Sequence, residues 1–324
     1  MMNERTAASK NYLKSFIAKD GSGVLLILIV FIVVVTVLTQ GKFLSANNIT
    51  NLLRSISVLG IMCCAITLVM ITGNIDLSVG SLLSLCACIS ATMVVNGLLL
   101  AIVVPMLVGL AAGFINGFLV GKMKLNPFII TLGMLSVYKA FTLLYANNRY
   151  LVPDENAAYQ AIGQGYFIDI PVPVWIFLAV AVIYYLVLKK TVFGTHIYSV
   201  GSNPTSSRFS GISSNKTVIA AYMLGGMTTG LSGVILCSTI MSAQAQLGNG
   251  YEFNAVTAIV LGGVSILGGK GSIPGTVMGV VFLGVLQNGF TLIGIPTAAQ
   301  YIIQGLMLII ALRLDSVKAG GHGR

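Results

Sequence analysis

Long apolar runs dominate the sequence, and they constrain the fold more than any other feature. Only 8% of the residues are charged, against about 25% in soluble domains, so this chain could not cover a water-facing surface. A helix needs about 20 apolar residues to cross a bilayer, with a range of about 17–25. We therefore predict an all-α polytopic membrane protein with about ten transmembrane helices. The candidate segments are 24–39, 56–72, 79–95, 98–120, 128–145, 172–188, 217–240, 253–267, 272–292 and 299–314.

Lysine and arginine placement predicts how the segments are threaded. With the N-terminus inside and ten spans, all but four of the 18 basic residues lie on the cytoplasmic side, where such residues are in excess. The exceptions are Lys42, Arg54 and Arg149 outside and Lys139 within a segment. This predicts one transmembrane domain over 1–324 with cytoplasmic termini, a tail at 1–21 and another at 315–324. It also accounts for the net charge of +10 without nucleic acid.

Segment 253–267 is the shortest of the ten. At roughly 1.5 Å per residue it reaches about 22 Å, against a hydrocarbon core of about 30 Å. If it did not cross, Lys270 and the basic residues that follow it would lie on the outer side. The charge bias therefore favours ten spans, and whether this segment crosses completely stays open.

The chain shows no constellation typical of catalysis or metal binding. Its five cysteines all lie inside apolar runs, where small buried hydrophobes are expected. No Cys/His group has zinc-ligand spacing. The two histidines, His196 and His322, fall in segments predicted to be cytoplasmic. We therefore expect no catalytic, cofactor or metal residues, and an intramembrane enzyme is the least favoured class.

The stretch "LGGVSILGGKGSIPGT" at 261–276 raises the question of a nucleotide site. A Walker-type phosphate loop needs G-x-x-x-x-G-K-[ST]. Counting back from Lys270 puts Val264 at the first glycine position, and Gly271 stands where Ser or Thr should hold magnesium. We predict instead a tight glycine-rich turn between two membrane helices, with Pro274 in the first turn of the second helix.

The predicted cytoplasmic loop 189–216 contains "SNPTSSRFSG", which has the signals of a short helix. Asn203 is a favoured N-cap, Pro204 fits the first helical position and Gly211 is a favoured stop. The pattern predicts roughly two helical turns. Two interpretations follow: an ordinary surface turn with a solvated Arg208, or a preformed docking element for a partner.

A faint internal repeat joins two interruptions. "TGNIDLS" at 72–78 and "LGNGYEF" at 247–253 each place an acid after Gly-Asn, and each precedes a short segment. With ten spans, two halves of five helices have opposite topology. Interrupted helices at matching positions of inverted halves mark substrate sites in many transporters. Chance explains so short a match about equally well.

Several separated motifs together resemble one transporter family. They are "GTHIYSVGSNPTSSRFSGI" at 194–212, "TGNIDLSVGSLLSL" at 72–85, "LNPFIITLGML" at 125–135, "PVPVWI" at 171–176 and "MSAQAQLGNGYEFNAVTAIVLGGVSILGGKGSIPGTVMGVVFLGVLQNGF" at 241–290. In this order they resemble the ribose/xylose-type (simple-sugar) ABC transporter permeases. The resemblance covers about 45–315.

The resemblance implies that this chain forms a translocation path and that a separate subunit supplies the energy by hydrolysing ATP. Two permease copies, or two close homologues, form the pore in the bacterial inner membrane. A cytoplasmic ATPase subunit, which binds ATP and magnesium, docks on the loop 189–216, and an external binding protein delivers the sugar. No cofactor is expected on this chain. The residues that match the family's coupling motif are Tyr198, Gly201, Asn203, Pro204, Arg208 and Gly211.

Two positions depart from the family pattern. Thr205, Ser206 and Ser207 stand where relatives carry an acid and alanines, which removes a favourable charge near a helix N-terminus. Asn254 follows Phe253 where relatives often have Asp. The first departure bears on the contacts with the partner, and the second on sugar preference.

Polar residues at membrane depth are candidates for the translocation path. An ionisable side chain there is costly and points to function by default. Asp76 and Lys139 are either functional or form an internal ion pair, and Lys139 has the further option of reaching toward the headgroups. Together with Asp76, the candidate path-lining residues are Asn74, Asn116, Glu252 and Asn254.

The sequence thus predicts the permease subunit of an ATP-driven importer for a ribose-like pentose or a hexose. Autoinducer-2 or a related sugar-like molecule is the alternative substrate, since its permeases share these motifs. An ion-coupled secondary transporter using Asp76 or Glu252 is less favoured. The sequence does not distinguish among sugars.

Overall fold

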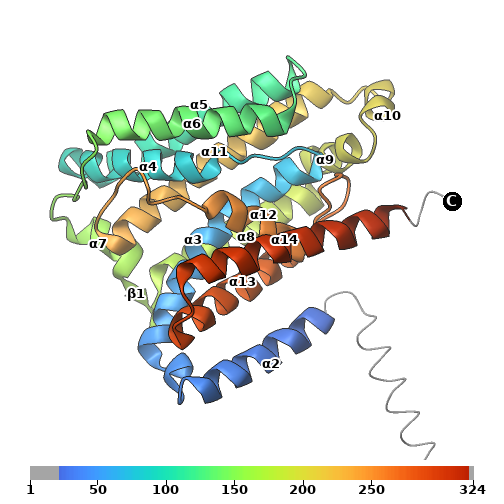
Figure 1. The fold of residues 1–324 in the computed structure, drawn as a ribbon. Helices are drawn as coiled ribbons and strands as arrows, with labels where there is room; N and C mark the ends of the chain where they lie inside the picture. The colour runs from blue at the N-terminus through green and yellow to red at the C-terminus, as the bar shows by residue number, and fades with distance from the viewer. Residues whose placement is uncertain (1–21, 321–324) are drawn as a thin grey trace, which may run out of the picture.

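The structure is a computed structural model that describes residues 22–320 (Figure 1). It is built almost entirely of helices, in keeping with the predicted all-α class. The α-helices are α2 Ser22–Leu38, α3 Ala46–Ile71, α4 Val79–Met93, α5 Leu98–Gly121, α6 Pro127–Ala146, α7 Ala157–Gln164, α8 Val172–Lys190, α9 Val192–Ser202, α10 Pro204–Phe209, α11 Ser214–Ile240, α12 Tyr251–Leu261, α13 Ile273–Ile293 and α14 Thr297–Gly320. Two 3-10 turns, η1 Lys42–Leu44 and η2 Val94–Asn96, and a hairpin of β1 Tyr166–Phe167 and β2 Ile170–Pro171 complete it.

Seven helices in this part of the chain are long and apolar enough to cross a membrane: α3, α4 with η2, α5, α6, α8, α11 and α13. Three further apolar helices, α2, α12 and α14, have shorter apolar stretches. Each of the ten predicted segments therefore contains a helix. The polytopic membrane class is confirmed, and the number of complete crossings stays a prediction.

Local sequence explains where many helices begin and end. At α6, the Asn126 side chain accepts hydrogen bonds from the Phe128 and Ile129 nitrogens, and Pro127 occupies the first turn. Asn147 ends the helix in the left-handed conformation, with φ 48°. These are the favoured N-cap, N1 and terminating residues of helices.

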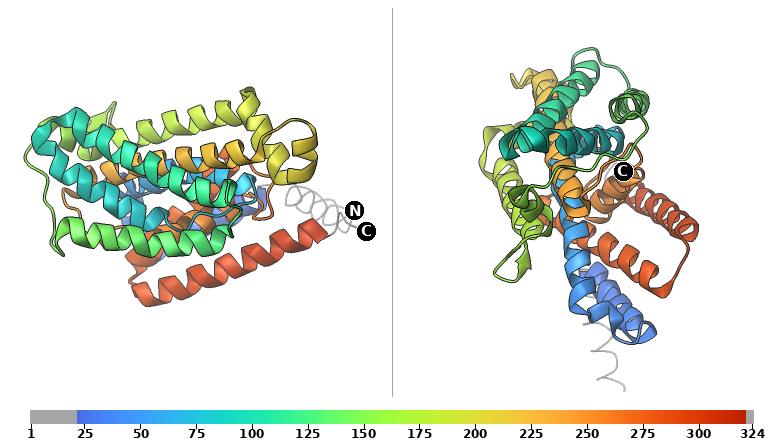
Figure 2. Two further views of the ribbon diagram at one scale, coloured as in Figure 1. Left: turned by 90° about the horizontal axis from the view of Figure 1, so that it is seen from above. Right: turned by 90° about the vertical axis from the view of Figure 1, so that its left-hand side faces the viewer.

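Helices α3 and α11 form the centre of the bundle. Seen from the side of α7, they run through the middle, with α5 and α6 on one flank and α13, α14 and α2 on the other (Figure 2). Helix α11 packs against α3, α4, α5 and α7. The α11–α5 contact is made by glycines, because Gly109 and Gly113 of α5 face the backbone of Gly226 and Tyr222 in α11. Small residues at such a contact let two membrane helices approach closely.

The structure differs from the predicted segments at several places. The outer connection 146–171 is folded, since it contains α7 and the β1–β2 hairpin. Helix α12 ends at Leu261 and a series of turns follows, so the predicted segment 253–267 is only partly helical. Helix α14 continues to Gly320 and takes in part of the predicted tail 315–324. The predicted tail 1–21 lies outside the described residues.

Candidate functional site

One end of the bundle carries the short helix α10, and we call it the α10 end (Figure 1). The Asn203 side chain accepts a hydrogen bond from the Ser206 nitrogen at 2.9 Å, and Pro204 begins the helix. After the C-cap Ser210, Gly211 has φ +78°, a conformation that favours glycine. The predicted short helix is confirmed, together with its caps. Helix α9, which precedes it, was not predicted.

The glycine-rich turn 262–272 lies between α9 and the end of α3. The Tyr198 hydroxyl donates to the Gly271 carbonyl at 2.8 Å, and the Gly269 nitrogen donates to the Ile71 carbonyl at 2.8 Å. A side chain on Gly201 would strike the Ile71 carbonyl and approach the Gly269 nitrogen to 2.6 Å. The turn therefore holds the α9–α10 element against the bundle, while Lys270 is exposed. Burial raises the pKa of the Tyr198 phenol.

We expect Tyr198→Phe to loosen this junction. The substitution removes one hydrogen bond and leaves the Gly271 carbonyl without it, which costs about 0.5–1.5 kcal/mol of stability. Thermal unfolding of the purified protein measures the loss. Tyr185→Phe in α8 is the control, because the Tyr185 hydroxyl makes no hydrogen bond to the residues that the structure describes. Equal melting temperatures for the two variants would contradict the role of Tyr198.

The first interruption, between α3 and α4, carries a buried polar chain. The Asp76 carboxylate accepts hydrogen bonds from the Ser78 nitrogen (2.9 Å) and hydroxyl (2.6 Å). The Asn116 amide donates to the Ser78 hydroxyl at 2.9 Å, and the Tyr138 hydroxyl lies 3.1 Å from the Asn116 carbonyl oxygen. These residues join α4, α5 and α6. Asp76 and Asn116 are buried, and Asn74 bonds locally to Thr72.

The ion pair considered for Asp76 and Lys139 is not formed in this structure. Lys139 instead directs its ammonium group toward the Asn249 side-chain oxygen, at 3.5 Å. The reason is helical geometry, since successive residues point about 100° apart. Tyr138 faces the chain that ends at Asp76, and Lys139 beside it therefore faces the segment 241–250.

The two interruptions meet inside the bundle. A Cβ on Gly80, in the first turn of α4, would lie 2.6 Å from the Gly248 carbonyl oxygen. The Ser84 hydroxyl accepts from the Gly248 nitrogen at 2.8 Å, and the buried Glu252 carboxylate lies beside Gly80. A carboxylate is favourable there, because the N-terminus of a helix carries partial positive charge. The structure thus brings Glu252 of α12 to the start of α4.

Asn254 belongs to a cluster of amides that sequence reasoning missed. Its side-chain oxygen accepts hydrogen bonds from Gln287 of α13, at 2.8 Å, and from Gln304 of α14. A second amide pair, Asn48 with Asn288, joins α3 to α13 by two reciprocal bonds of 2.8 and 2.9 Å. The available signal was each amide's place within or next to an apolar run.

Phe209 was also missed. It lies in α10 and is 89% exposed. A single exposed apolar side chain is common on a protein surface, so its interest lies in its position within the predicted docking loop. It adjoins Arg208 of the predicted coupling motif.

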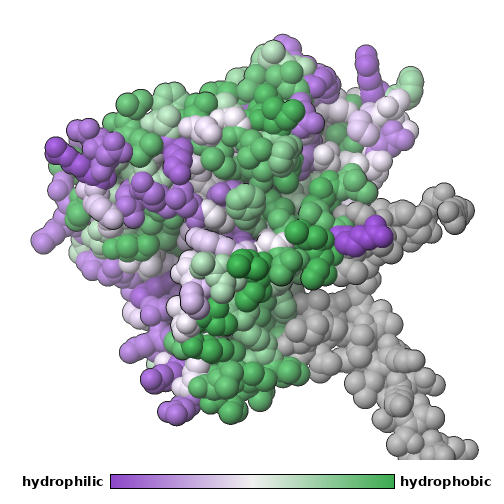
Figure 3. Space-filling view, in the orientation of Figure 1, coloured by the Kyte–Doolittle hydropathy of each residue, from purple (hydrophilic) through white to green (hydrophobic). Residues whose placement is uncertain are grey.

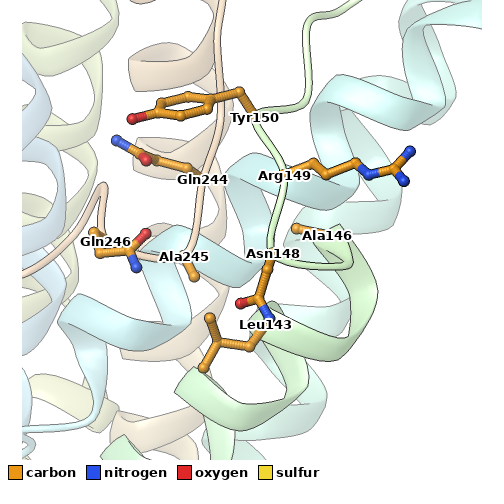
Figure 4. A pocket seen from close by; sticks show the side chains of 8 residues that line it. All are labelled: Leu143, Ala146, Asn148, Arg149, Tyr150, Gln244, Ala245 and Gln246. Atoms are coloured by element: carbon orange, nitrogen blue, oxygen red, sulfur yellow. The ribbon is translucent and has the colours of Figure 1, made fainter.

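At the opposite end, which we call the α7 end, a small pocket opens between α6 and the segment 241–250. Its polar side chains include Arg149 and Tyr150 from one side and Gln244 and Gln246 from the other (Figure 4). Beside the pocket, Leu151 and Ala243 form an isolated antiparallel bridge that joins the two segments. Beyond the pocket, the segment 241–250 carries a further exposed amide, Asn249.

Comparisons with known proteins identify the family of the chain. A sequence model of the family described as "branched-chain amino acid transport system / permease component" matches residues 48–312. The ribose import permease protein RbsC of Bacillus subtilis is 38% identical over 90% of this chain and 91% of its own length. The corresponding protein of Escherichia coli K12 is 37% identical over 98% of this chain and all of its own.

The L-arabinose transport system permease protein AraH of Escherichia coli is 31% identical over 92% of this chain and 91% of its own length. No solved structure matches the chain. Because the family match and the relatives extend over nearly the whole sequence, the chain belongs to the ribose-type family of ABC transporter permeases.

Proposed function

We propose that this chain forms the translocation path of an ATP-driven importer for ribose or a similar simple sugar. The observation that carries the proposal is the similarity to a ribose import permease over 98% of this chain and the whole of that relative. The multi-pass helical bundle supplies the membrane-spanning part. The bacterial inner membrane is its proposed location, with the α10 end in the cytoplasm.

In this proposal ATP and magnesium bind a separate cytoplasmic subunit, which docks on α10. Support comes from the exposed Phe209 and from the junction of α9 with the turn 262–272. That turn contacts the end of α3, next to the interruption that starts α4. Movement of α10 would thus reach the interrupted helices through rigid, hydrogen-bonded elements.

The proposed path involves the place where the interruptions 72–78 and 241–250 meet. Helix α12 spans only roughly 16 Å at 1.5 Å per residue, so the segment before it enters the bundle to complete the crossing. Irregular backbone at membrane depth is tolerated where it is buried or lines a cavity. A second permease copy or a close homologue would face the place where the two interruptions meet. A sugar-binding protein would meet the α7 end.

Uptake by reconstituted vesicles tests the proposal. The chain is assembled with and without its ATPase, its binding protein and ATP, and pentoses, hexoses and autoinducer-2 are supplied. Sugar uptake only with the complete set is the expected result. Uptake of autoinducer-2 alone would select the alternative substrate. Uptake by the chain alone under a proton or sodium gradient would replace the proposal with a secondary transporter that uses Asp76 or Glu252.

A further inference from the structure

Asn254, Gln287 and Gln304 form a three-amide cluster from three different helices. Gln287 lies six residues before the end of α13, and Gln304 lies seven residues after the start of α14. At about 1.5 Å per residue, Gln287 lies about 9 Å and Gln304 about 10.5 Å from the helix ends that meet at the α13–α14 connection. Asn254 reaches the same level because α12 begins inside the bundle. The cluster thus lies about two helical turns in from the ends of α13 and α14, within the apolar stretches of these helices.

Some side-chain donor and acceptor atoms of the cluster make no hydrogen bond to the described residues. Asn254 Oδ1 accepts from both glutamines, which leaves Asn254 Nδ2 and the two glutamine Oε1 atoms without a partner among the described residues. These three atoms are not buried. Among the described residues, the buried side-chain polar atoms without a hydrogen-bond partner belong instead to Arg54, Ser232 and Thr257. All three amide residues are partly exposed. Together they present one donor group and two acceptors.

Facing hydrocarbon would leave these amide atoms without partners, which is unfavourable. The surrounding surface indicates that the amide atoms face water instead. Hydrophilic side chains run from the α7 end toward the middle of the face between α6 and α14 (Figure 3). Gln246 and Asn249 are exposed in the segment that leads to α12, and Lys139 bonds to Asn249. This polar surface begins at the pocket of Figure 4.

We propose that the three-amide cluster contacts the hydroxyl groups of the sugar during passage and helps to set which sugars pass. The inference rests on the proposed import of a simple sugar. Neutral amides suit a neutral polyol, since a hydroxyl both donates and accepts hydrogen bonds. Without a charge in the cluster, each contact is modest and the sugar can leave again. The Asn48–Asn288 pair differs, because its two bonds are reciprocal and join only α3 and α13.

Thiol labelling tests whether the cluster faces water. In the complete transporter, Gln304→Cys should react with a membrane-impermeant methanethiosulfonate, and the sugar-loaded binding protein should slow the reaction. The five native cysteines are buried, so the background is low. Leu306→Cys is the matched control, since Leu306 is two residues along α14, on the other side of the helix, and 54% exposed. Resistance of Gln304→Cys in both the resting and the ATP-trapped transporter would overturn the inference.

Sugar selectivity tests contact with hydroxyl groups. Ribose and 2-deoxyribose uptake are compared in transporters that share one binding protein, so its own preference cancels between variants. Gln304→Leu should lower ribose uptake about tenfold, the equivalent of one lost hydrogen bond to substrate, and 2-deoxyribose uptake less. Gln304→Asn should recover part of the difference. Asn288→Leu, which breaks the other amide pair, should leave the ratio of the two uptakes unchanged.

An equal loss for both sugars in Gln304→Leu, or the same change of ratio in Asn288→Leu, would show that the amides only hold helices together. Failure of the proposed function gives a different result, because the unmodified transporter would then take up no sugar. The labelling result still decides whether the cluster lines a water-filled path.

Discussion

Deletion of residues 204–210 is expected to abolish ATP-driven uptake while the protein still accumulates in the membrane. The segment forms α10, which packs chiefly against α9 and α11 at one end of the bundle. Its removal therefore leaves the long apolar helices and their contacts in place. What is lost is the exposed Phe209 and Arg208 surface proposed to receive the ATPase. Uptake, membrane abundance and co-purification with the ATPase subunit are measured together.

Three point variants sharpen this experiment. Phe209→Ala should weaken co-purification and uptake, because an aromatic ring that becomes buried on binding commonly supplies much of an interface's binding energy. Thr205→Ala, on the same short helix and also exposed, removes only a few atoms and should lower both much less. Gly211→Pro should act like the deletion, since proline cannot adopt φ +78°. Normal uptake by the deletion variant would exclude α10 as the coupling element.

Apolar runs predicted most of the membrane helices because backbone in hydrocarbon must satisfy its own hydrogen bonds. The predicted segment 98–120 and helix α5, Leu98–Gly121, differ by one residue. Helix α3 begins ten residues before its predicted segment, at Ala46. The added turns, "ANNITNLLRS", are polar, and Ser45 caps them. Hydropathy does not detect a helix that extends into water.

Short elements outside the apolar runs were harder to predict. Helix α10 was found because Asn203, Pro204 and Gly211 are strong local signals at the right spacing. Helix α7 has a comparable N-cap, Asn156, which accepts from the Tyr159 nitrogen. Its eight residues contain no long apolar run, so hydropathy does not distinguish them from the rest of the connection 146–171.

The candidate site depends on contacts between distant residues, which the sequence predicted only in part. The faint match of "TGNIDLS" with "LGNGYEF", which chance explains about equally well, predicted no contact between the two segments, and the structure places Gly80 against Gly248. Which partner each polar residue takes was not predictable. Lys139 bonds to Asn249, and Asn254 to two glutamines, because helix rotation and packing decide these pairs.

The close contact between α11 and α5 leads to the largest expected effect on stability. A Cβ on Gly226 of α11 would lie 3.0 Å from the Gly113 nitrogen of α5 and nearer still to the Gly109 carbonyl oxygen. Both neighbours are backbone atoms, so the two helices must separate. Overpacking of this kind costs about 1–3 kcal/mol or more. We expect Gly226→Ala to lower the melting temperature clearly and Gly226→Leu to prevent recovery of folded protein from the membrane.

Gly225, the preceding residue on α11, provides the matched control for this contact. A Cβ there would lie 3.5 Å from the Val69 side chain, an ordinary packing distance. Gly225→Ala should therefore keep or raise the melting temperature, since alanine stabilises a helix by about 0.5–1 kcal/mol relative to glycine. The two variants share composition, helix and depth, so a difference between them isolates the approach of α5 to α11. Equal melting temperatures would mean that the helices separate at no cost, and that other contacts of α11 hold the bundle together.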